Sequence, residues 1–279
     1  MFTEDLTATI QLNVTTALNE DIRDGDLTAQ LIPADRTALA RIISRQQAVL
    51  CGSSWFEACF LHTDPDCRIV WSAKDGDLLK PNQEICQIEG NARAMLTAER
   101  TALNFLQTLS GTATLTRSYV EAVSGINVKI MDTRKTLPGL RIAQKYAVQT
   151  GGGQNQRIGL FDGILIKENH ISAAGGIRQA MDLARSAAPQ GMSIQIEVET
   201  LEQLEEALEA NAELILLDNF SMMNLRRAVS LTGKRAVLEA SGNINLEKVI
   251  LVAETGVNRI SIGSLTKDVK AADLSMRFE

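Results

Sequence analysis

The feature that most constrains the fold is a regular alternation of apolar and helical segments in the second half of the chain. After residue 126, short apolar runs recur at 128–131, 164–166, 194–198, 214–217, 236–238 and 259–262, with helical patterns between them. Continuous apolar strands that alternate with helices are typical of a parallel sheet covered by helices. No GxGxxG motif follows the first run and no P-loop motif is present, which disfavours a doubly wound nucleotide-binding sheet. We predict an α/β fold whose second half is an incomplete, TIM-like parallel barrel of about six to seven strands.

The first part of the chain follows another pattern. A helix is expected at 5–19, and short alternating segments separated by turns predict an antiparallel sheet with one helix at 54–62. Helical periodicity then runs from 92 to 109, and after a break at Ser110 and Gly111 a second helix is expected to reach 122. We therefore expect an α+β sandwich domain at 1–110, a catalytic barrel domain at 111–265, and a tail at 266–279 that packs with the first domain.

Composition narrows the range of partners and locations. The formal net charge is −6 and no run of 18 apolar residues occurs, which disfavours nucleic-acid binding and a membrane span. Residues 1–5 lack the basic start of a signal peptide, and the four cysteines lack metal-binding spacing. We expect a cytoplasmic protein with reduced thiols and small-molecule ligands, and with no nucleic-acid or membrane partner.

Each apolar run ends in residues that a buried strand would not normally contain. These exits lie at 132–135, 167–170, 197–199, 218–219, 239–242 and 263–264. A solvated loop after each strand is the simpler interpretation of any one of them. Active sites of barrel enzymes, however, lie at the carboxyl ends of the strands, so six exits in phase predict one shared catalytic mouth.

The charges at this mouth form two groups. Between residues 129 and 170, seven lysines and arginines stand against three acids, and such cations suit phosphate and carboxylate ligands. Later exits contribute Glu197 and Asp218, and two carboxylates beside a phosphate site suit Mg²⁺ held partly by substrate oxygens and water. Gly242 and Gly263 follow two successive strands, where backbone N–H groups can approach a phosphate.

Two runs in this region are specific. Asp-Thr-Arg-Lys-Thr at 132–136 and Leu-Ile-Lys-Glu-Asn-His-Ile at 165–171, with matching segments at 99–104, 197–199, 217–219 and 240–242, strongly resemble the quinolinate phosphoribosyltransferase family. The resemblance covers nearly the whole chain. It implies an N-terminal α/β sandwich, an incomplete C-terminal α/β barrel and a homodimer with shared active sites. It also implies that quinolinate and 5-phosphoribosyl 1-diphosphate react, with Mg²⁺, to nicotinate mononucleotide, diphosphate and CO₂ in NAD biosynthesis.

The resemblance also implies roles for individual residues. The cations expected around the quinolinate carboxylates are Arg100, Arg134, Arg157 and Lys167, with Arg100 reaching the site of the second chain. Thr133 is expected to bind substrate, Lys135 and Lys167 to meet the phosphoribosyl donor, and Glu197 and Asp218 to serve the ribose and Mg²⁺. The catalytic group is therefore Lys135, Lys167, Glu197 and Asp218. The residues expected to cradle the phosphate are Ser241, Gly242, Asn243, Ile262, Gly263 and Ser264.

One departure and two alternatives accompany this interpretation. The family usually has histidine where this chain has Gln156, which puts a charged role at that position in doubt, and His170 is expected to pack or hydrogen-bond rather than to catalyse. A Schiff-base barrel lyase with Lys167 or Lys135 as nucleophile also fits the barrel pattern, although such a lysine needs a mostly apolar pocket. A related phosphoribosyltransferase that acts on another aromatic acid is the closer alternative.

Overall fold

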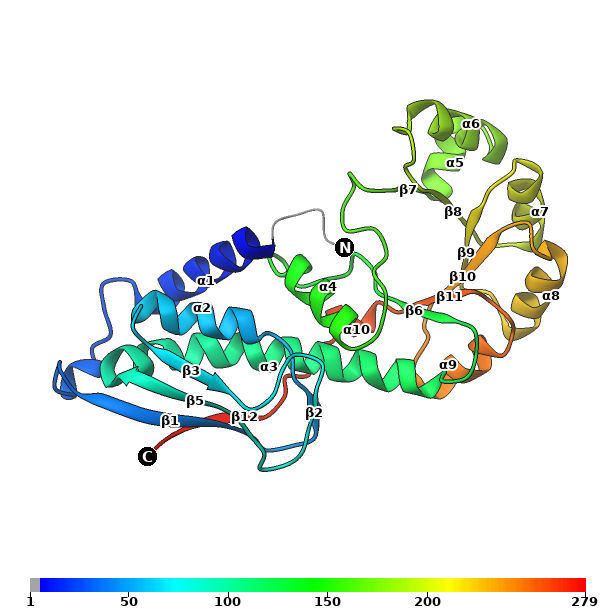
Figure 1. Cartoon of the computed structure of the whole chain (residues 1–279). Coiled ribbons are helices and arrows are strands. Elements are labelled where there is room, and N and C mark those ends of the chain that lie inside the picture. Colours follow the sequence, from blue (N-terminus) through cyan, green and yellow to red (C-terminus); the bar gives the residue numbers. More distant parts are fainter. Residues whose placement is uncertain (1–5) are drawn as a thin grey trace. The chain divides into compact units, whose positions relative to one another are not determined.

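Figure 1 shows the computed structural model, which describes residues 6–279. The chain divides into two compact units. The N-terminal unit comprises the described residues up to Arg117, Thr136–Gly152 and Thr266–Glu279, and the barrel unit comprises Ser118–Lys135 and Gly153–Leu265. The first residue of the helix expected at 5–19, and the residues used to argue against a signal peptide, lie outside the described part.

The N-terminal unit is built on an antiparallel sheet with the strand order β12-β1-β5-β3. The tail strand β12 pairs with β1, with Met276 opposite Ile42, so the last segment of the chain completes this sheet. The sheet strands are β1 (Thr37–Ser44), β3 (Arg68–Trp71), β5 (Glu84–Asn91) and β12 (Leu274–Phe278). A separate antiparallel pair is formed by β2 (Ala48–Val49) and β4 (Leu78–Leu79).

The four longest helical segments of this unit, coloured blue to green in Figure 1, share one apolar core with the sheet. The helices are α1 (Leu6–Ile22), α2 (Ser53–Thr63), the part of α3 (Ala92–Ala122) up to Arg117, α4 (Arg141–Thr150), α10 (Ser264–Lys267, of which Ser264 and Leu265 fall in the barrel unit) and the short 3₁₀ helix η1 (Ala29–Leu31). Residues 136–152, which the sequence-based domain limits place in the barrel, belong to the N-terminal unit because Ala143 and Ala147 of α4 are buried in this core.

The expected helix break at Ser110 and Gly111 is wrong, because α3 is continuous from Ala92 to Ala122. The Ser110 hydroxyl accepts a hydrogen bond from the Cys51 N–H (2.9 Å), and it donates one to the Cys51 carbonyl (3.2 Å). At Gly111, a Cβ would lie 2.2 Å from the Lys270 carbonyl oxygen. The pair therefore permits a close approach of other segments to the helix, and a glycine inside a helix costs only about 1 kcal/mol.

The barrel unit contains the predicted parallel sheet with helices. Its six strands have the order β6-β11-β10-β9-β8-β7 and all their pairings are parallel, so their carboxyl ends share one edge. The strands are β6 (Lys129–Met131), β7 (Ile164–Ile166), β8 (Ile194–Val198), β9 (Leu214–Asp218), β10 (Val237–Ser241) and β11 (Arg259–Ser261). The helices are α5 (Glu168–Ala174), α6 (Ile177–Ala187), α7 (Leu201–Glu209), α8 (Met222–Thr232) and α9 (Leu246–Ala253).

The predicted incompleteness of the barrel is confirmed. The strands β6 and β7 form the two edges of the sheet, and no described strand pairing joins them. The segment 153–163, which connects the rest of the chain to β7, pairs with the free edge of β6 instead, because Gln154 donates to the Ile130 carbonyl (2.8 Å) and accepts from Asp132 (3.1 Å). None of the helices within residues 6–279 is both long and apolar enough to cross a membrane.

Candidate functional site

A cavity of about 260 Å³ opens at the carboxyl ends of the barrel strands. This is the end at which barrel enzymes place their catalytic residues, because loops from every strand converge there. The cavity is lined by Thr133, Arg134, Lys135, Gln156, Arg157, Leu165, Lys167, Glu197, Leu216, Asp218, Glu239, Ser241 and Ser261. Charged and polar side chains therefore surround a space large enough for a small ring.

Strand register explains why these side chains meet. Leu216 of β9 is paired with Glu197 of β8 on one side and with Glu239 of β10 on the other, so the three residues form one row. Two residues further along, Asp218 is paired with Ser241. Because alternate residues of a strand point to the same face, both rows face the inside of the barrel.

The structure brings together most of the predicted site residues, namely Thr133, Arg134, Lys135, Arg157, Lys167, Glu197, Asp218 and Ser241. Gly263 lies beside this cavity, since a Cβ there would be 3.0 Å from Cδ of Lys135. The remaining members of the predicted phosphate cradle, Gly242, Asn243, Ile262 and Ser264, are not in the lining. Gly242 has φ +106° and a Cβ there would lie 2.1 Å from Oδ1 of Asn219, so only glycine fits.

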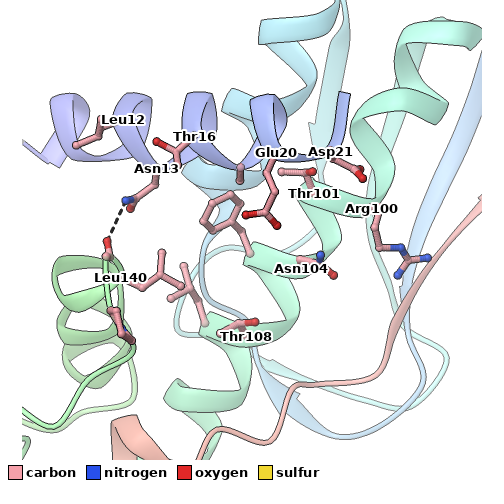
Figure 2. A pocket seen from close by; sticks show the side chains of 15 residues that line it. Leu12, Asn13, Thr16, Glu20, Asp21, Arg100, Thr101, Asn104, Thr108 and Leu140 are labelled. Atoms are coloured by element: carbon pink, nitrogen blue, oxygen red, sulfur yellow. Dashed lines mark hydrogen bonds between the residues drawn. The ribbon is translucent and has the colours of Figure 1, made fainter. Parts of the chain in front are cut away.

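Arg100 belongs to the N-terminal unit and lines a different hollow. That hollow has a volume of about 530 Å³ and lies between α1, α3 and residues 138–140. Figure 2 shows Arg100 and Asn104 on α3, and Asn13 of α1 donating a hydrogen bond to the Gly139 carbonyl (3.2 Å). The expected role of Arg100 at a barrel mouth therefore stays a prediction.

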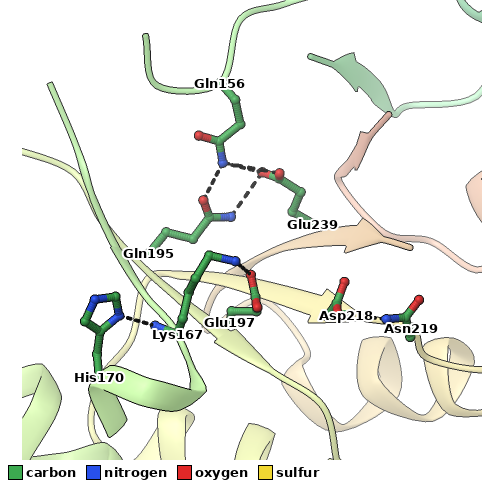
Figure 3. A network of polar contacts seen from close by, with 8 residues as sticks. All are labelled: Gln156, Lys167, His170, Gln195, Glu197, Asp218, Asn219 and Glu239. Atoms are coloured by element: carbon green, nitrogen blue, oxygen red, sulfur yellow. Dashed lines mark hydrogen bonds and ion pairs between the residues drawn. The ribbon is translucent and has the colours of Figure 1, made fainter. Parts of the chain in front are cut away.

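A carboxylate pair and a lysine occupy one side of the cavity. Lys167 Nζ contacts Glu197 Oε2 at 2.7 Å, and Figure 3 shows this pair. The Glu197 side chain is only 14% exposed. Burial raises the pKa of the Asp218 carboxyl, and the neighbouring Glu197 raises it further, while Lys167 and Lys135 act in the opposite direction. Two carboxylates close enough to repel each other would gain from a divalent cation.

Two guanidinium groups occupy the other side. Burial lowers the pKa of Arg157, and the nearby charge of Arg134 lowers it further, whereas Asp162 opposes both effects. Arg157 Nη1 donates a hydrogen bond to the Gly163 carbonyl (2.9 Å), which leaves further N–H donors for a ligand. Cations that repel one another in a partly buried space favour an anionic ligand, because the ligand relieves the repulsion.

Sequence reasoning missed several polar residues around the cavity. Gln195 is buried and hydrogen-bonds with Gln156 and with Glu239, the buried first residue of the exit at 239–242. The Ser261 hydroxyl is buried with no hydrogen-bond partner in residues 6–279. A polar residue inside an apolar run was the available signal for Gln195 and Ser261. His170 Nδ1 accepts a hydrogen bond from the Lys167 N–H (3.0 Å), so this residue makes a hydrogen bond as expected.

Among the described residues, no group of three or more histidines, cysteines, aspartates or glutamates could hold a metal ion by itself. The Mg²⁺ site suggested by the sequence does not require such a group, because substrate oxygens and water can supply the remaining ligands. Mg²⁺ often keeps several waters and binds through one or two carboxylates together with substrate phosphates. Glu197 and Asp218 match that donor set.

Comparisons with known proteins cover both units. The chain matches family models described as quinolinate phosphoribosyl transferase, N-terminal domain, over residues 26–110, and C-terminal domain, over residues 112–277. It is 44% identical over 257 residues to a probable nicotinate-nucleotide pyrophosphorylase (carboxylating) of Bacillus subtilis, over 92% of this chain and 89% of that protein. It is 41% identical to the carboxylating nicotinate-nucleotide pyrophosphorylase of Mycobacterium leprae, over 93% of this chain and 94% of that protein. The structure of the nicotinate-nucleotide pyrophosphorylase from Francisella tularensis superposes with a TM-score of 0.96 at 43% identity, over 99% of this chain and 98% of that one.

Proposed function

Because the chain belongs to the quinolinate phosphoribosyltransferase family, we propose that it transfers the phosphoribosyl group of 5-phosphoribosyl 1-diphosphate to quinolinate. The products are nicotinate mononucleotide, diphosphate and CO₂, and the reaction serves NAD biosynthesis. The observation that carries this proposal is the pair of mutually repelling guanidinium groups, Arg134 and Arg157, in one cavity with Lys167.

The substrate explains the number of cations. Quinolinate carries two carboxylates on adjacent ring carbons, and their desolvation must be offset by several charged hydrogen-bond donors. Arg134 and Arg157 offer planar donor pairs, and Lys167 adds a point charge that the 2.7 Å contact with Glu197 holds in place. A monocarboxylate would leave part of this positive charge uncompensated.

The chemistry needs positioning and electrostatics more than proton transfer. The pyridine nitrogen attacks C1 of the ribose, and the bond to diphosphate breaks with its electron pair on the leaving group. Positive charge develops on the sugar, where Glu197 or Asp218 can stabilise it, and negative charge on the diphosphate, where Lys135 and Lys167 can stabilise it. The nitrogen is then cationic and accepts electron density as the neighbouring carboxylate leaves as CO₂. The electron pair left on the ring carbon takes a proton, which water can supply.

Mg²⁺ is part of this proposal. Glu197 and Asp218 would hold it together with the diphosphate and water, and it would supply charge neutralisation at the leaving group. The raised pKa of Asp218, caused by burial and by Glu197, supports a cation at this position. In this proposal Arg134 and Arg157 hold the acid, and Lys167 lies beside Glu197 next to the position of the phosphoribosyl donor.

The test is to compare quinolinate with nicotinate, each with 5-phosphoribosyl 1-diphosphate and Mg²⁺. We expect release of CO₂ and formation of nicotinate mononucleotide from quinolinate, and no mononucleotide from nicotinate. Equal turnover of both acids would refute the proposed match between the cations and a dicarboxylate. A Schiff-base lyase is disfavoured because Lys167 is paired with Glu197, and borohydride trapping with a carbonyl substrate would reveal it.

We also propose that the enzyme works in the cytoplasm as a homodimer with shared sites, in which Arg100 completes the mouth of the second chain. The support is that Arg100 lies in the N-terminal unit, outside the barrel strands, and lines a hollow of about 530 Å³ there. Mixing the inactive variants Arg100→Ala and Lys135→Ala tests it. Random exchange makes about half of the dimers hybrid, with one intact site each, so roughly a quarter of wild-type activity should return. Demonstrated exchange without recovery would mean that each chain completes its own site.

A further inference from the structure

In the wall of the cavity, three side chains from different elements are hydrogen-bonded to one another and are here called the amide–carboxylate network: Gln156, Gln195 and Glu239. Gln156 Nε2 donates to Gln195 Oε1 (2.5 Å) and to Glu239 Oε1 (3.3 Å). Gln195 Nε2 donates to Glu239 Oε2 (3.1 Å). Figure 3 shows Gln156 entering from the connecting segment and meeting the other two side chains, which come from β8 and β10.

Burial determines which atoms of this network donate hydrogen bonds and which accept them. Glu239 is 1% exposed and Gln195 is 6% exposed, so the carboxylate needs donors from the protein. An ionised carboxylate only accepts hydrogen bonds, and it therefore requires the NH₂ groups of both amides. The Oε1 atom of Gln156 must then point away from Glu239, and it accepts a hydrogen bond from the backbone N–H of Arg157 (2.7 Å).

The segment that contains Asn155, Gln156 and Arg157 is also hydrogen-bonded to Asp132. The backbone N–H of Gln156 donates to Asp132 Oδ1 (2.8 Å), and Asn155 Nδ2 donates to Asp132 Oδ2 (2.6 Å). Asp132 is fully buried. The turn that carries Arg157 is thus fixed between a buried aspartate and the amide–carboxylate network.

These hydrogen bonds hold Arg157 against electrostatic repulsion from Arg134. Arg134 and Arg157 line the same cavity, and burial and the charge of Arg134 lower the pKa of Arg157, as expected for guanidinium groups that repel each other. An anion bound between the two guanidinium groups would relieve this repulsion. Holding Arg157 in place before the ligand arrives removes a cost of ordering from the binding step.

Resting on the proposed function, we infer that Gln195 is a positioning residue for the acid substrate. It acts through Gln156 and Glu239 to hold Arg157 where a second carboxylate of the ring can pair with it. Gln195 is not in the described lining of the cavity, so its effect does not require contact with substrate. Gln156 and Glu239 do line the cavity, so a substitution there could also change contacts with the substrate. A substitution at Gln195 therefore tests the positioning of Arg157 separately from substrate contact.

The test uses Gln195→Met, which keeps the side-chain volume and removes both hydrogen bonds. We expect the Kd and KM for quinolinate to rise about five- to tenfold, as for loss of hydrogen bonds in a buried network. The KM for 5-phosphoribosyl 1-diphosphate should stay within about twofold. The matched control is Thr232→Val on α8, another buried polar-to-apolar change in the barrel unit, which should alter neither constant.

A double-mutant cycle separates positioning from general loosening. In an Arg157→Lys background, Gln195→Met should change the quinolinate Kd by less than about twofold, because the group it positions is already altered. In an Arg134→Lys background the full effect should persist. If Gln195→Met does not fold, Gln195→Asn takes its place, since the shorter amide keeps its polarity and loses its reach.

Several results would overturn the inference: equal effects on both substrates, a lowered melting temperature with unchanged quinolinate affinity, or additivity with Arg157→Lys. Wild-type protein that neither binds nor converts quinolinate would refute the proposed function, and the positioning role with it. Because wild type is measured first, that failure is distinct from an active enzyme that tolerates Gln195→Met.

Discussion

Replacing Gln156 by histidine places a titratable ring in the amide–carboxylate network. The Nε2 atom of Gln156 lies 3.3 Å from Glu239 Oε1, and its Oε1 atom accepts from the Arg157 N–H. A neutral imidazole has one donor and one acceptor, and a charged one has two donors. The substituted ring can therefore keep the bond to Glu239, but when charged it cannot accept from Arg157.

The magnitude follows from that exchange. One neutral hydrogen bond lost to the Arg157 backbone costs about 1 kcal/mol, and the charge-assisted pair with Glu239 offsets part of it. The variant should fold and keep its catalytic efficiency with quinolinate within about tenfold of wild type, which corresponds to about 1.4 kcal/mol. Glu239 is 1% exposed and accepts hydrogen bonds from the amides of Gln156 and Gln195, so its negative charge should raise the pKa of an imidazole introduced beside it above about 6.5.

The sign of the pH dependence follows from this raised pKa. Stability from the new ion pair is fully present below pH about 6.5, and it is lost as the pH rises through the higher folded-state pKa. The added positive charge should also favour the dicarboxylate at low pH. The assay is the pH profile of kcat/KM for quinolinate together with thermal unfolding at the same pH values, compared with wild type. Complete loss of activity in a folded variant, or no new ionisation between pH 6 and about 8.5, would refute this reasoning.

Two further predictions concern the carboxylates and the backbone of the same cavity. Glu197→Ala and Asp218→Ala should lower kcat far more than they weaken quinolinate binding, because these groups act on charge that develops in the transition state; calorimetry showing binding abolished in folded variants of both would contradict this division. Gly242→Ala should lower the free energy of unfolding by about 2 kcal/mol more than Gly191→Ala, as denaturant unfolding can measure. Both glycines have positive φ, but a Cβ meets Asn219 at 2.1 Å only at Gly242, whereas nothing lies within 4 Å at Gly191, so equal losses would mean that the clash relaxes freely.

The barrel could be predicted because parallel strands are buried on both faces and therefore leave continuous apolar runs. The six runs correspond to β6 to β11, and the polar residue after each run marks its carboxyl end. The same rule located Arg134, Lys167, Glu197 and Asp218 in one cavity, since parallel strands end at one edge. No structural detail beyond strand position was needed for that inference.

Where prediction failed, local rules conflicted with tertiary packing. Ser110 and Gly111 read as a helix break, yet they lie inside α3 because Cys51 and Lys270 approach the helix there. Residues 136–152 follow the first barrel strand in sequence, yet α4 buries its apolar face in the core of the N-terminal unit. Burial partners of this kind are set by distant segments, which sequence spacing does not reveal.

The two-residue period of a β-strand could also have identified Gln195 from the sequence. Gln195 lies two residues before Glu197 on β8, so both side chains face the inside of the barrel, with Gln195 one row deeper. Glu239 lies on β10, beyond the intervening strand β9, and neighbouring strands are about 4.8 Å apart. Only long side chains can meet across such a strand, which is why a glutamine and a glutamate stand at these two positions. A polar residue two positions before a predicted catalytic residue, within an otherwise apolar run, is therefore a candidate support for the site.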